Sequence, residues 1–370
     1  MGLAFKFGHE PELRPDGAVW IGPNLPGRAT ELREESGALW ELCGLLDGTR
    51  DRAQIVDEVL ASRTDVTAPQ LGEILDYFLR SGWLFDTGAP VPPELTDRDL
   101  DRHSRGAAFL SSVDFRPEST GYGLQAGLKA AKVVVLGLGG VGSAVATGLA
   151  ASGIGRLHCV DHDTVELSNL NRQVLYTEQD IGVAKVDAAV KRLRSLNSDI
   201  EITGADALLD GPQSLARECA GADVVVLCAD TPQVIIREWM DEFAFGHAVP
   251  WLCAHYNGPK FSTAAFIPGK TACHSCLRAT TAAKQRIDGR SPEFPAFVGA
   301  PATHQAVLAP SAQISGYYLV METIRLLAGL EVQTAGRELC RFLTDYEQYY
   351  YLEAEPQADC AVRCGALLGR

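Results

Sequence analysis

The segment Gly137-Leu-Gly139-Gly-Val-Gly142 restricts the fold of this chain more than any other part of the sequence. It follows an apolar run at 132–136 and precedes a helix-like stretch at 142–153. In that context glycines allow backbone N–H groups to approach phosphate oxygens, and the N-terminus of the following helix favours negative charge. The motif therefore predicts a nucleotide site between a strand and a helix. By itself it would favour a nicotinamide-dependent dehydrogenase.

The residues from 130 onward alternate between apolar runs and helical patterns. Buried parallel strands are expected at 132–136, 156–160 and 223–228, because each is a short and mostly apolar run. Helices are expected at 142–153 and 183–196, where apolar side chains recur at helical spacing. This alternation predicts an α/β fold with an open, doubly wound, Rossmann-like sheet.

A proline-rich break at 86–94 divides the chain, because prolines stiffen the backbone and cannot continue a helix. The part before the break has the order strand, three helices, strand. These elements are expected at 18–21, 36–46, 51–61, 68–81 and 83–85. This order matches a small, winged-helix-like α+β domain. We therefore predict one domain of residues 1–90 and a nucleotide-binding domain of residues 91–370.

The first domain is acidic, since residues 1–95 hold eight Lys and Arg against sixteen Asp and Glu. The whole chain carries a formal net charge of −14. Binding to nucleic-acid phosphates or to an anionic membrane would require the opposite sign, so neither partner is expected. A peptide, held by strand pairing or in a helix groove, suits such a domain better. The alternative is a packing appendage without a ligand.

The sequence contains no uninterrupted apolar stretch of about 18 residues, which a membrane-spanning helix needs. The N-terminal residues are too polar and too interrupted by proline for a signal peptide. We therefore expect a cytoplasmic protein, in a compartment where disulfides are rare. The ten cysteines are then core residues, metal ligands or nucleophiles.

A cluster of polar and charged residues follows the second strand, in Asp161-His-Asp-Thr-Val-Glu-Leu-Ser-Asn-Leu-Asn-Arg-Gln173. Asp161 would accept hydrogen bonds from ribose hydroxyls. Asn169, Arg172 and, in the next helix, Lys185 could hold a triphosphate and offset charge on a pyrophosphate leaving group. A dehydrogenase needs no such set, so the cluster favours nucleotidyl transfer. Taken singly, these residues could also be a helix cap and solvated surface charges.

These segments resemble the ubiquitin-activating-type adenylyltransferases of the ThiF, MoeB and HesA kind. The resemblance rests on GxGGVG, on VDHDTVELSNLNRQ and on a lysine thirteen residues after the arginine. It extends over roughly residues 98–365. It implies an enzyme that binds ATP and Mg²⁺ and adenylates a carboxylate, typically at the C-terminus of a small protein or peptide.

The resemblance also implies roles for individual residues. Asp230 would bind Mg²⁺, although Thr231-Pro232 stands where the family usually has Asn. The candidate nucleotide-binding residues are Gly137, Gly139, Gly140, Gly142, Asp161, Asp163, Asn169, Arg172, Gln173 and Lys185. The candidate catalytic residues are Arg105, Arg172, Lys185 and Asp230.

The segment Arg102-His-Ser-Arg105 is similar to the family's R-Y-x-R-Q motif, with Gly106 in place of Gln. In the family the second arginine reaches the γ-phosphate bound by the neighbouring subunit of a homodimer. The resemblance therefore implies a homodimer in which Arg105 has this role. The alternative is an exposed charge on a helix.

Two cysteine pairs, Cys273-His-Ser-Cys276 and Cys360-Ala-Val-Arg-Cys364, could form a closed tetrahedral zinc site. The family often has such a site, with C-x₂-C in both halves. The extra residue in the second pair lies within the spacings of about two to four that zinc tolerates. The alternatives are two unrelated pairs, a surface disulfide, or His274 as a ligand.

The remaining cysteines mostly lie in apolar runs and are expected in the core. They are Cys43, Cys159, Cys219, Cys228, Cys253 and Cys340. We therefore expect direct attack on the acyl adenylate, without a covalent enzyme intermediate.

The first domain indicates the substrate, because plain ThiF and MoeB types lack it. A winged-helix-like domain ahead of the adenylation domain resembles MccB-type enzymes, in which it clamps a precursor peptide. Stretches 251–261 and 267–270 also resemble that type, and 255–266 would line the peptide channel. We therefore predict an ATP-dependent adenylyltransferase that activates a carboxyl or amide-derived group on a ribosomally made precursor peptide.

Other interpretations stay open at this point. His255 and His304 could act as acid or base in the channel, or be structural. The substrate could instead be a ubiquitin-like sulfur carrier. The chain could also be a leader-binding scaffold for a cyclodehydratase, but a scaffold would be expected to lose nucleotide residues that are present here. A dehydrogenase is the least favoured.

Overall fold

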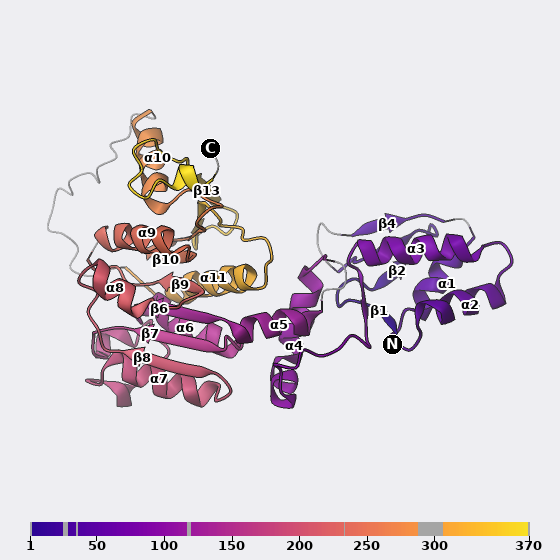
Figure 1. Ribbon diagram of the computed structural model, residues 1–370, viewed down its shortest axis with the longest axis horizontal. Helices are drawn as coiled ribbons and strands as arrows, with labels where there is room; N and C mark the ends of the chain where they lie inside the picture. Colours follow the sequence, from indigo (N-terminus) through magenta and orange to yellow (C-terminus); the bar gives the residue numbers. More distant parts are fainter. Residues whose placement is uncertain are drawn as a thin grey trace. The chain divides into compact units, whose positions relative to one another are not determined.

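The computed structural model describes residues 2–24, 29–34, 36–116, 120–232, 234–287 and 306–368. The chain forms two compact units, Met1–Gly127 and Leu128–Arg370. Each unit has its own hydrophobic core. Figure 1 shows the elements of both units.

Three short helices form the centre of the first unit: α1 (Ala38–Leu45), α2 (Arg52–Ser62) and α3 (Ala68–Arg80). At the start of α2, the Asp51 side chain accepts the N–H of Gln54, and the Gln54 side chain accepts the N–H of Asp51. Burial of large apolar side chains, each worth about 1.5–3 kcal/mol, holds the three helices together. The fully buried members are Leu42, Ile55, Val59, Leu71, Leu75 and Phe78. The helices expected from apolar periodicity are thus confirmed.

The strands of the first unit are more numerous than expected. β3 (Val19–Ile21) and β5 (Leu84–Asp86) lie where strands were predicted. β3 pairs antiparallel with β2 (Pro11–Leu13) and with β4 (Thr30–Leu32), and β5 pairs antiparallel with β1 (Leu3–Phe5). The sequence did not predict β1, β2 or β4, because a three-residue strand is too short to show an alternating pattern.

Two further helices, α4 (Asp97–Val113) and α5 (Gly121–Ala130), precede the first strand of the second unit. The buried Lys6 ammonium donates a hydrogen bond of 2.8 Å to the carbonyl oxygen of Asp114, directly after α4. The compact unit therefore extends beyond the break at 86–94, to Gly127. The division of function between residues 1–90 and 91–370 remains a prediction.

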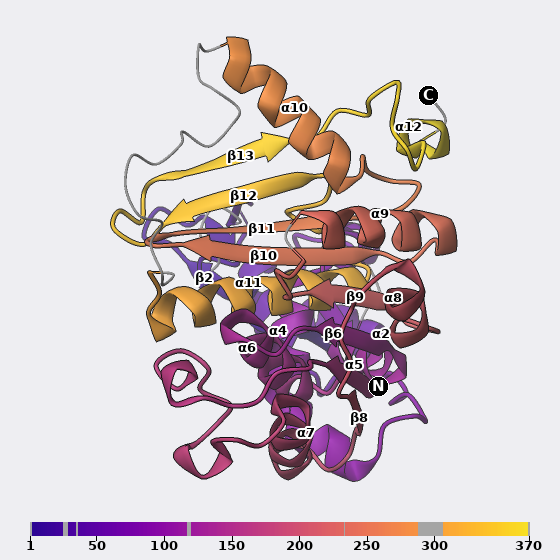
Figure 2. The same ribbon diagram turned by 90° about the vertical axis from the view of Figure 1, so that its left-hand side faces the viewer.

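The second unit is built on an eight-stranded sheet in the order β13-β12-β11-β10-β9-β6-β7-β8 (Figure 2). The strands from β10 to β8 in this order are parallel, and β11, β12 and β13 continue the sheet antiparallel. Their bounds are β6 (Lys132–Leu136), β7 (Arg156–Val160), β8 (Glu201–Ala205), β9 (Val224–Leu227), β10 (Trp251–Asn257), β11 (Lys260–Phe266), β12 (Arg337–Phe342) and β13 (Tyr349–Glu353). This arrangement confirms the predicted doubly wound α/β sheet.

Helices lie in two groups against the sheet (Figure 1). One group contains α6 (Gly140–Ala151), α7 (Lys185–Leu196) and α11 (Ala309–Leu327). The other contains α8 (Pro212–Glu218), α9 (Ile235–His247) and α10 (His274–Ile287). Short helical turns η1 (Leu167–Asn169), η2 (Glu178–Asp180) and α12 (Cys364–Leu367) complete the unit. Over the described ranges, no helix combines the length and apolar character needed to cross a bilayer.

Two helices begin at other residues than the sequence predicted. α7 starts at Lys185 rather than 183, because the carbonyl of Val183 accepts the N–H of Val165 and the chain is still extended there. α6 starts at Gly140 rather than 142, directly after the tight turn that ends β6.

Candidate active site

The glycine-rich turn joins β6 to α6, and two of its positions accept only glycine. Gly137 has a φ of 90°, and a Cβ there would lie 2.6 Å from the backbone nitrogen of Ala229. A Cβ on Gly142 would lie 1.8 Å from the carbonyl oxygen of Gly137. The turn therefore brings the first N–H groups of α6 to the sheet edge between β6 and β9, where the strand order reverses.

We expect Gly142→Ala to weaken ATP binding by about tenfold or more, which is about 1.4 kcal/mol. The added Cβ must displace the turn, because the Gly137 oxygen leaves it no room. Calorimetric titration with ATP measures the effect. The matched control is Gly246→Ala on α9, where a Cβ meets no atom within 4 Å. Equal affinities of the two variants would contradict this view of the turn.

Asp161 and Tyr176 hold the turn from two sides at Leu138. The carboxylate of Asp161 accepts the N–H of Leu138 at 2.6 Å and the N–H of Asp163 at 2.9 Å. The buried Tyr176 hydroxyl donates to the carbonyl oxygen of Leu138 at 3.0 Å. Asp161 thus shapes the nucleotide turn directly, in addition to its proposed contact with a ribose. Sequence reasoning missed Tyr176.

Lys185 and Asp163 form an ion pair beside this turn. The ammonium of Lys185 lies 2.7 Å from the Asp163 carboxylate, and its side chain is only 7% exposed. Burial raises the pKa of Asp163, but the hydrogen bond and charge of Lys185 outweigh this effect and lower the pKa. Nearby, the Asn169 side chain accepts the N–H of Glu166 at 3.1 Å. The structure therefore pairs Lys185 with Asp163, while Asn169 is bonded within its own loop, and the role of all three toward a nucleotide stays a prediction.

Arg172 is joined to the glycine-rich turn through Gln313 of α11. The side chain of Gln313 donates to the carbonyl oxygens of Arg172 at 2.9 Å and of Gly140 at 3.4 Å. Among the described residues, the Nε of Arg172 and the Oε1 of Gln173 are buried without a hydrogen-bond partner. Buried polar groups normally find a partner, so these two atoms suit a bound polar ligand. Gln313 lies 141 residues from Arg172 in sequence, and no local pattern indicates it.

Asp230 lies three residues after β9, at the same edge of the sheet. Its exposed carboxylate accepts a hydrogen bond of 3.3 Å from the hydroxyl of Thr231. Burial raises the pKa of Tyr256 on β10. The Arg172 guanidinium lowers this pKa, whereas the Asp230 carboxylate raises it further. Tyr256 is therefore within electrostatic range of both Arg172 and Asp230. Sequence reasoning did not single out Tyr256.

Two of the predicted residues are not placed in this site by the structure. Arg105 is exposed on α4 of the first unit, and its role toward a partner subunit stays a prediction. His304 lies outside the described residues. The stretch 255–266 forms the end of β10 and all of β11.

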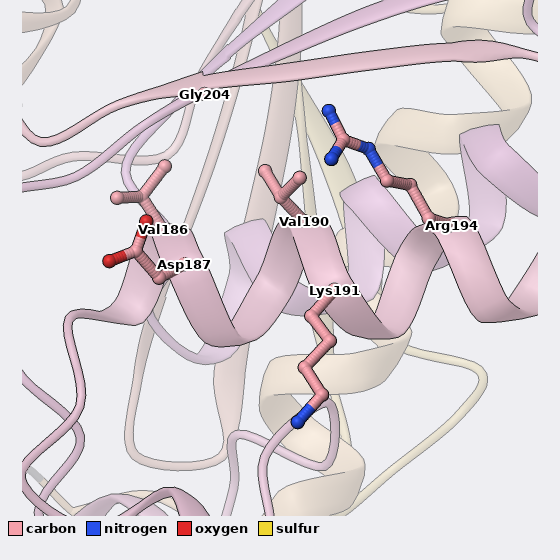
Figure 3. A pocket seen from close by; sticks show the side chains of 6 residues that line it. All are labelled: Val186, Asp187, Val190, Lys191, Arg194 and Gly204. Carbon is pink, nitrogen blue, oxygen red and sulfur yellow. The ribbon is translucent and has the colours of Figure 1, made fainter.

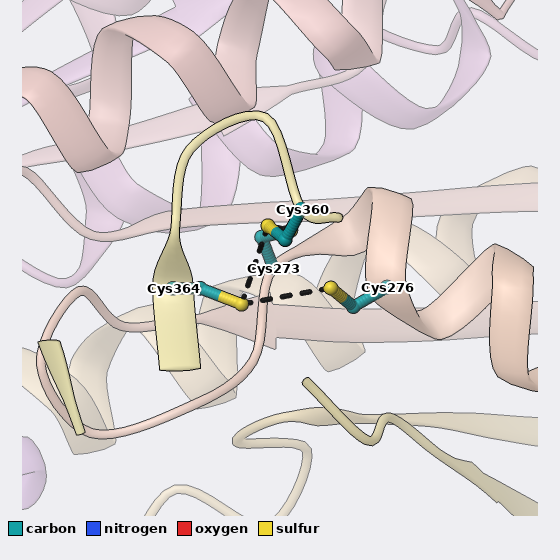
Figure 4. Close-up of side chains that lie close together, drawn as sticks. All are labelled: Cys273, Cys276, Cys360 and Cys364. Carbon is teal, nitrogen blue, oxygen red and sulfur yellow. Dashed lines mark hydrogen bonds between the residues drawn. The ribbon is translucent and has the colours of Figure 1, made fainter. Parts of the chain in front are cut away.

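The four predicted zinc ligands come together, although the two pairs are more than 80 residues apart (Figure 4). The Sγ atoms lie 3.6 Å apart in Cys273–Cys360, in Cys276–Cys364 and in Cys360–Cys364. A tetrahedron with zinc–sulfur bonds of about 2.3 Å has edges of about 3.8 Å. The cluster therefore has the size of a zinc site, and all four cysteines are free thiols rather than disulfides.

The backbone explains how the longer second spacing is accommodated. Arg363, the third residue between Cys360 and Cys364, has a φ of 48° and turns the chain back toward the cluster. On the other side, Asp241 accepts the N–H groups of His274 and Ser275 and so caps α10. His274 packs against Trp251 and Phe266 and is not in the cluster, so the structure does not support it as an alternative ligand.

We expect the purified protein to contain one zinc ion per chain, and Cys364→Ser to lose it and to unfold at a lower temperature. Removal of one ligand opens a closed site that joins α12 to α10. Elemental analysis and a thermal melt measure both effects. The control is Cys219→Ser, a buried cysteine outside the cluster, which should keep its zinc. Full zinc content in Cys364→Ser would contradict the assignment.

The other cysteines are mostly buried, as expected for core residues. They are Cys43, Cys159, Cys219, Cys253 and Cys340, whereas Cys228 is partly exposed. Burial raises the pKa of Cys159 and of Cys253 to about 12. These thiols are protonated at neutral pH and are poor nucleophiles.

A separate cavity of about 540 Å³ lies between α7 and the edge strand β8 (Figure 3). Val186, Val190 and Arg194 line it from α7, and Gly204 lines it from β8. A Cβ on Gly204 would lie 2.4 Å from Val186, so the strand approaches the helix closely here. None of the predicted nucleotide residues lines this cavity.

Comparison with known proteins places these observations in context. The model of the ThiF family matches residues 113–362. Molybdopterin-synthase adenylyltransferase of Escherichia coli K12 is 31% identical over 246 residues, covering 66% of this chain and 88% of that protein. Sulfur carrier protein ThiS adenylyltransferase of the same organism is 30% identical over 274 residues, covering 73% and 97%.

A solved structure extends the similarity to the whole chain. The crystal structure of E. coli MccB with AMPCPP and MccA matches with a TM-score of 0.76 at 19% sequence identity. The match covers 98% of this chain and 99% of that chain. At this identity the comparison shows a shared fold, including the small unit that precedes the sheet.

Proposed function

Since this chain belongs to the ThiF family and is an ATP-dependent, acyl-adenylate-forming adenylyltransferase, we propose that its substrate is a ribosomally made precursor peptide. The group activated would be a carboxyl or amide-derived group of that peptide. One observation carries the proposal: the MccB-like fold extends over 98% of the chain, whereas the family model begins only at residue 113. The solved relative contains MccA together with an ATP analogue.

The surface of the first unit supports a peptide partner. Phe7, Leu13, Trp40 and Tyr77 are at least 40% exposed there. Within the described part of this unit, β2 and β4 are the outer strands of their sheet, and an extended peptide can pair with such an edge. The acidic character of residues 1–95 favours a peptide with basic residues.

The proposed chemistry follows from the charges around the turn. A carboxylate is a poor electrophile and repels the α-phosphate of ATP. Arg172 and Lys185, together with Mg²⁺ held by Asp230, would offset this repulsion and the charge on departing pyrophosphate. The N–H groups after Gly139 and the side chains of Asn169 and Gln173 would hold the nucleotide. Arg105 would complete the site of a partner subunit in a homodimer.

Exchange of labelled pyrophosphate into ATP tests the proposal. The full chain is incubated with ATP, Mg²⁺ and peptides encoded by short reading frames next to its gene. We expect exchange that depends on one of these peptides. Binding of a peptide without any exchange would favour a scaffold, and no binding would contradict a peptide substrate.

The second candidate function is activation of a ubiquitin-like sulfur carrier. The names of the relatives that share 30–31% identity favour it. A carrier protein ending in two glycines, added to the same exchange assay, distinguishes this function from the first.

A further inference from the structure

His255 lies at the edge of the sheet that carries Asp230. The pairing of β10 with β9 ends at Cys253 and Leu227, so His255 extends two residues beyond the last paired position. The chain that follows β9 passes Asp230 and enters α9, whose first turn contains Arg237. The positive charge of Arg237 lowers the pKa of His255. His255 thus lies at the carboxyl end of the strand next to β9, the strand that Asp230 follows.

The ring of His255 has two polar side chains against it and is partly exposed. The Ser262 hydroxyl, directly opposite in the β10–β11 pairing and fully buried, lies 2.9 Å from Nε2 and 3.2 Å from Nδ1. The carboxylate of Glu338 on β12 lies 3.4 Å from Nε2. The His255 side chain is nonetheless 49% exposed, against 16% for Glu338. Ser262 is too deeply buried to attack a substrate itself, whereas the histidine ring is accessible.

We propose that His255 is the general base of the second half-reaction, in which a nitrogen nucleophile of the bound peptide attacks the acyl adenylate. Glu338 and Ser262 are positioning residues that orient the ring. The assignment rests on the proposed function, because it requires an adenylated peptide. It gives a role to a histidine that the adenylation step does not use.

The charges around His255 suit this role. Partial burial and the positive charges of Arg237 and Lys260 lower the pKa of His255, while Glu338 opposes this shift. His274, at the start of α10, also interacts with the ring. The imidazole is therefore neutral at neutral pH and able to accept a proton, and the nearby carboxylate stabilises the imidazolium that forms.

The step balances as follows. The nitrogen of an amine or amide forms a bond to the activated carbonyl carbon, and its proton passes to the imidazole. The bond between that carbon and the adenylate oxygen breaks, and AMP leaves with the electron pair. No oxidant or further co-reactant takes part. Adenylation itself precedes this proton transfer and does not depend on it.

The variant His255→Gln tests the proposal on the full chain with the peptide that supports pyrophosphate exchange. We expect exchange to remain within about fivefold of wild type, while product formation falls by about 100-fold or more, the usual contribution of a general base. Hydroxylamine, a nucleophile that needs no base, should trap the peptidyl adenylate as a hydroxamate at similar rates in both proteins. In the wild type, the rate of product formation should decrease as the pH falls below the lowered pKa of His255. This decrease at low pH, the acid limb of the pH profile, should disappear in the variant.

The controls separate a catalytic role from a structural one. His247→Gln, on the exposed end of α9, should leave exchange and product formation unchanged. Glu338→Gln and Ser262→Ala should slow product formation less and shift the acid limb. A parallel loss of exchange and product in His255→Gln, or unchanged product formation, would overturn the proposal. Absence of exchange in wild type with every peptide would instead overturn the proposed function, and this assignment with it.

Discussion

Replacement of Asp230 by alanine is expected to reduce peptide-dependent pyrophosphate exchange by at least about 10²- to 10³-fold. Asp230 presents an exposed carboxylate at the edge of the sheet, and Tyr256 is within electrostatic range of both Asp230 and Arg172. Loss of the carboxylate removes the group that we propose for Mg²⁺, and with it the charge compensation that the departing pyrophosphate needs.

The same variant should still bind the peptide, because the proposed binding surface belongs to the first unit. Fluorescence anisotropy of a labelled peptide measures this binding. Asp206→Ala is the matched control, since Asp206 is an exposed aspartate that directly follows another parallel strand, β8. Exchange at the wild-type rate in Asp230→Ala would show that the carboxylate does not hold the metal.

Replacement of Lys185 by methionine is the second large effect that we expect, with a loss of exchange of about 10²-fold or more. The Lys185 ammonium is nearly buried. It forms an ion pair with Asp163, which lies beside the glycine-rich turn. Methionine keeps most of the packing volume but removes the charge that would meet the phosphates. Lys191→Met, on the exposed side of the same helix, is the control.

Loss of this ion pair should also change how the free energy of unfolding of the variant depends on pH. Lys185 holds the pKa of Asp163 below its ordinary value in the folded state. A carboxyl with a lowered folded-state pKa contributes stability above its unfolded pKa and loses the contribution as the pH falls. Denaturant unfolding should therefore separate wild type from Lys185→Met at pH 7, and the difference should shrink below about pH 4. A difference independent of pH would contradict a role for this pair.

The parallel core of the fold could be predicted from the sequence because its strands are fully buried. Val133 to Leu136 have no exposed surface, so the run is apolar without alternation. By contrast, β8 is an edge strand with mixed exposure, and its sequence resembles a loop. The β10–β11 hairpin has a two-residue loop, Gly258-Pro259, and the glycine with a φ of 59° at its first position is a local turn signal that could have identified it.

The local arrangement of the candidate site was predictable where its residues are close in sequence. The glycine-rich turn, Asp163 and Lys185 belong to the consecutive elements from β6 to α7, and the cysteine pairs have metal-ligand spacing. Three further side chains come from distant segments. Tyr176 bonds to Leu138, and Gln313 bonds to Gly140 and Arg172. Tyr256 lies within electrostatic range of Arg172. Such contacts depend on tertiary packing, which a single sequence does not show.

Direct detection of an adenylated peptide tests the central claim of this account. The full chain is incubated with Mg²⁺, with ATP labelled in its α-phosphate, and with the peptides from neighbouring reading frames. A carrier protein that ends in two glycines is tested in parallel. After an acid quench, mass spectrometry and the label identify the molecule that carries AMP. The account predicts AMP on a peptide, whereas label on the carrier alone, or on neither, would contradict it.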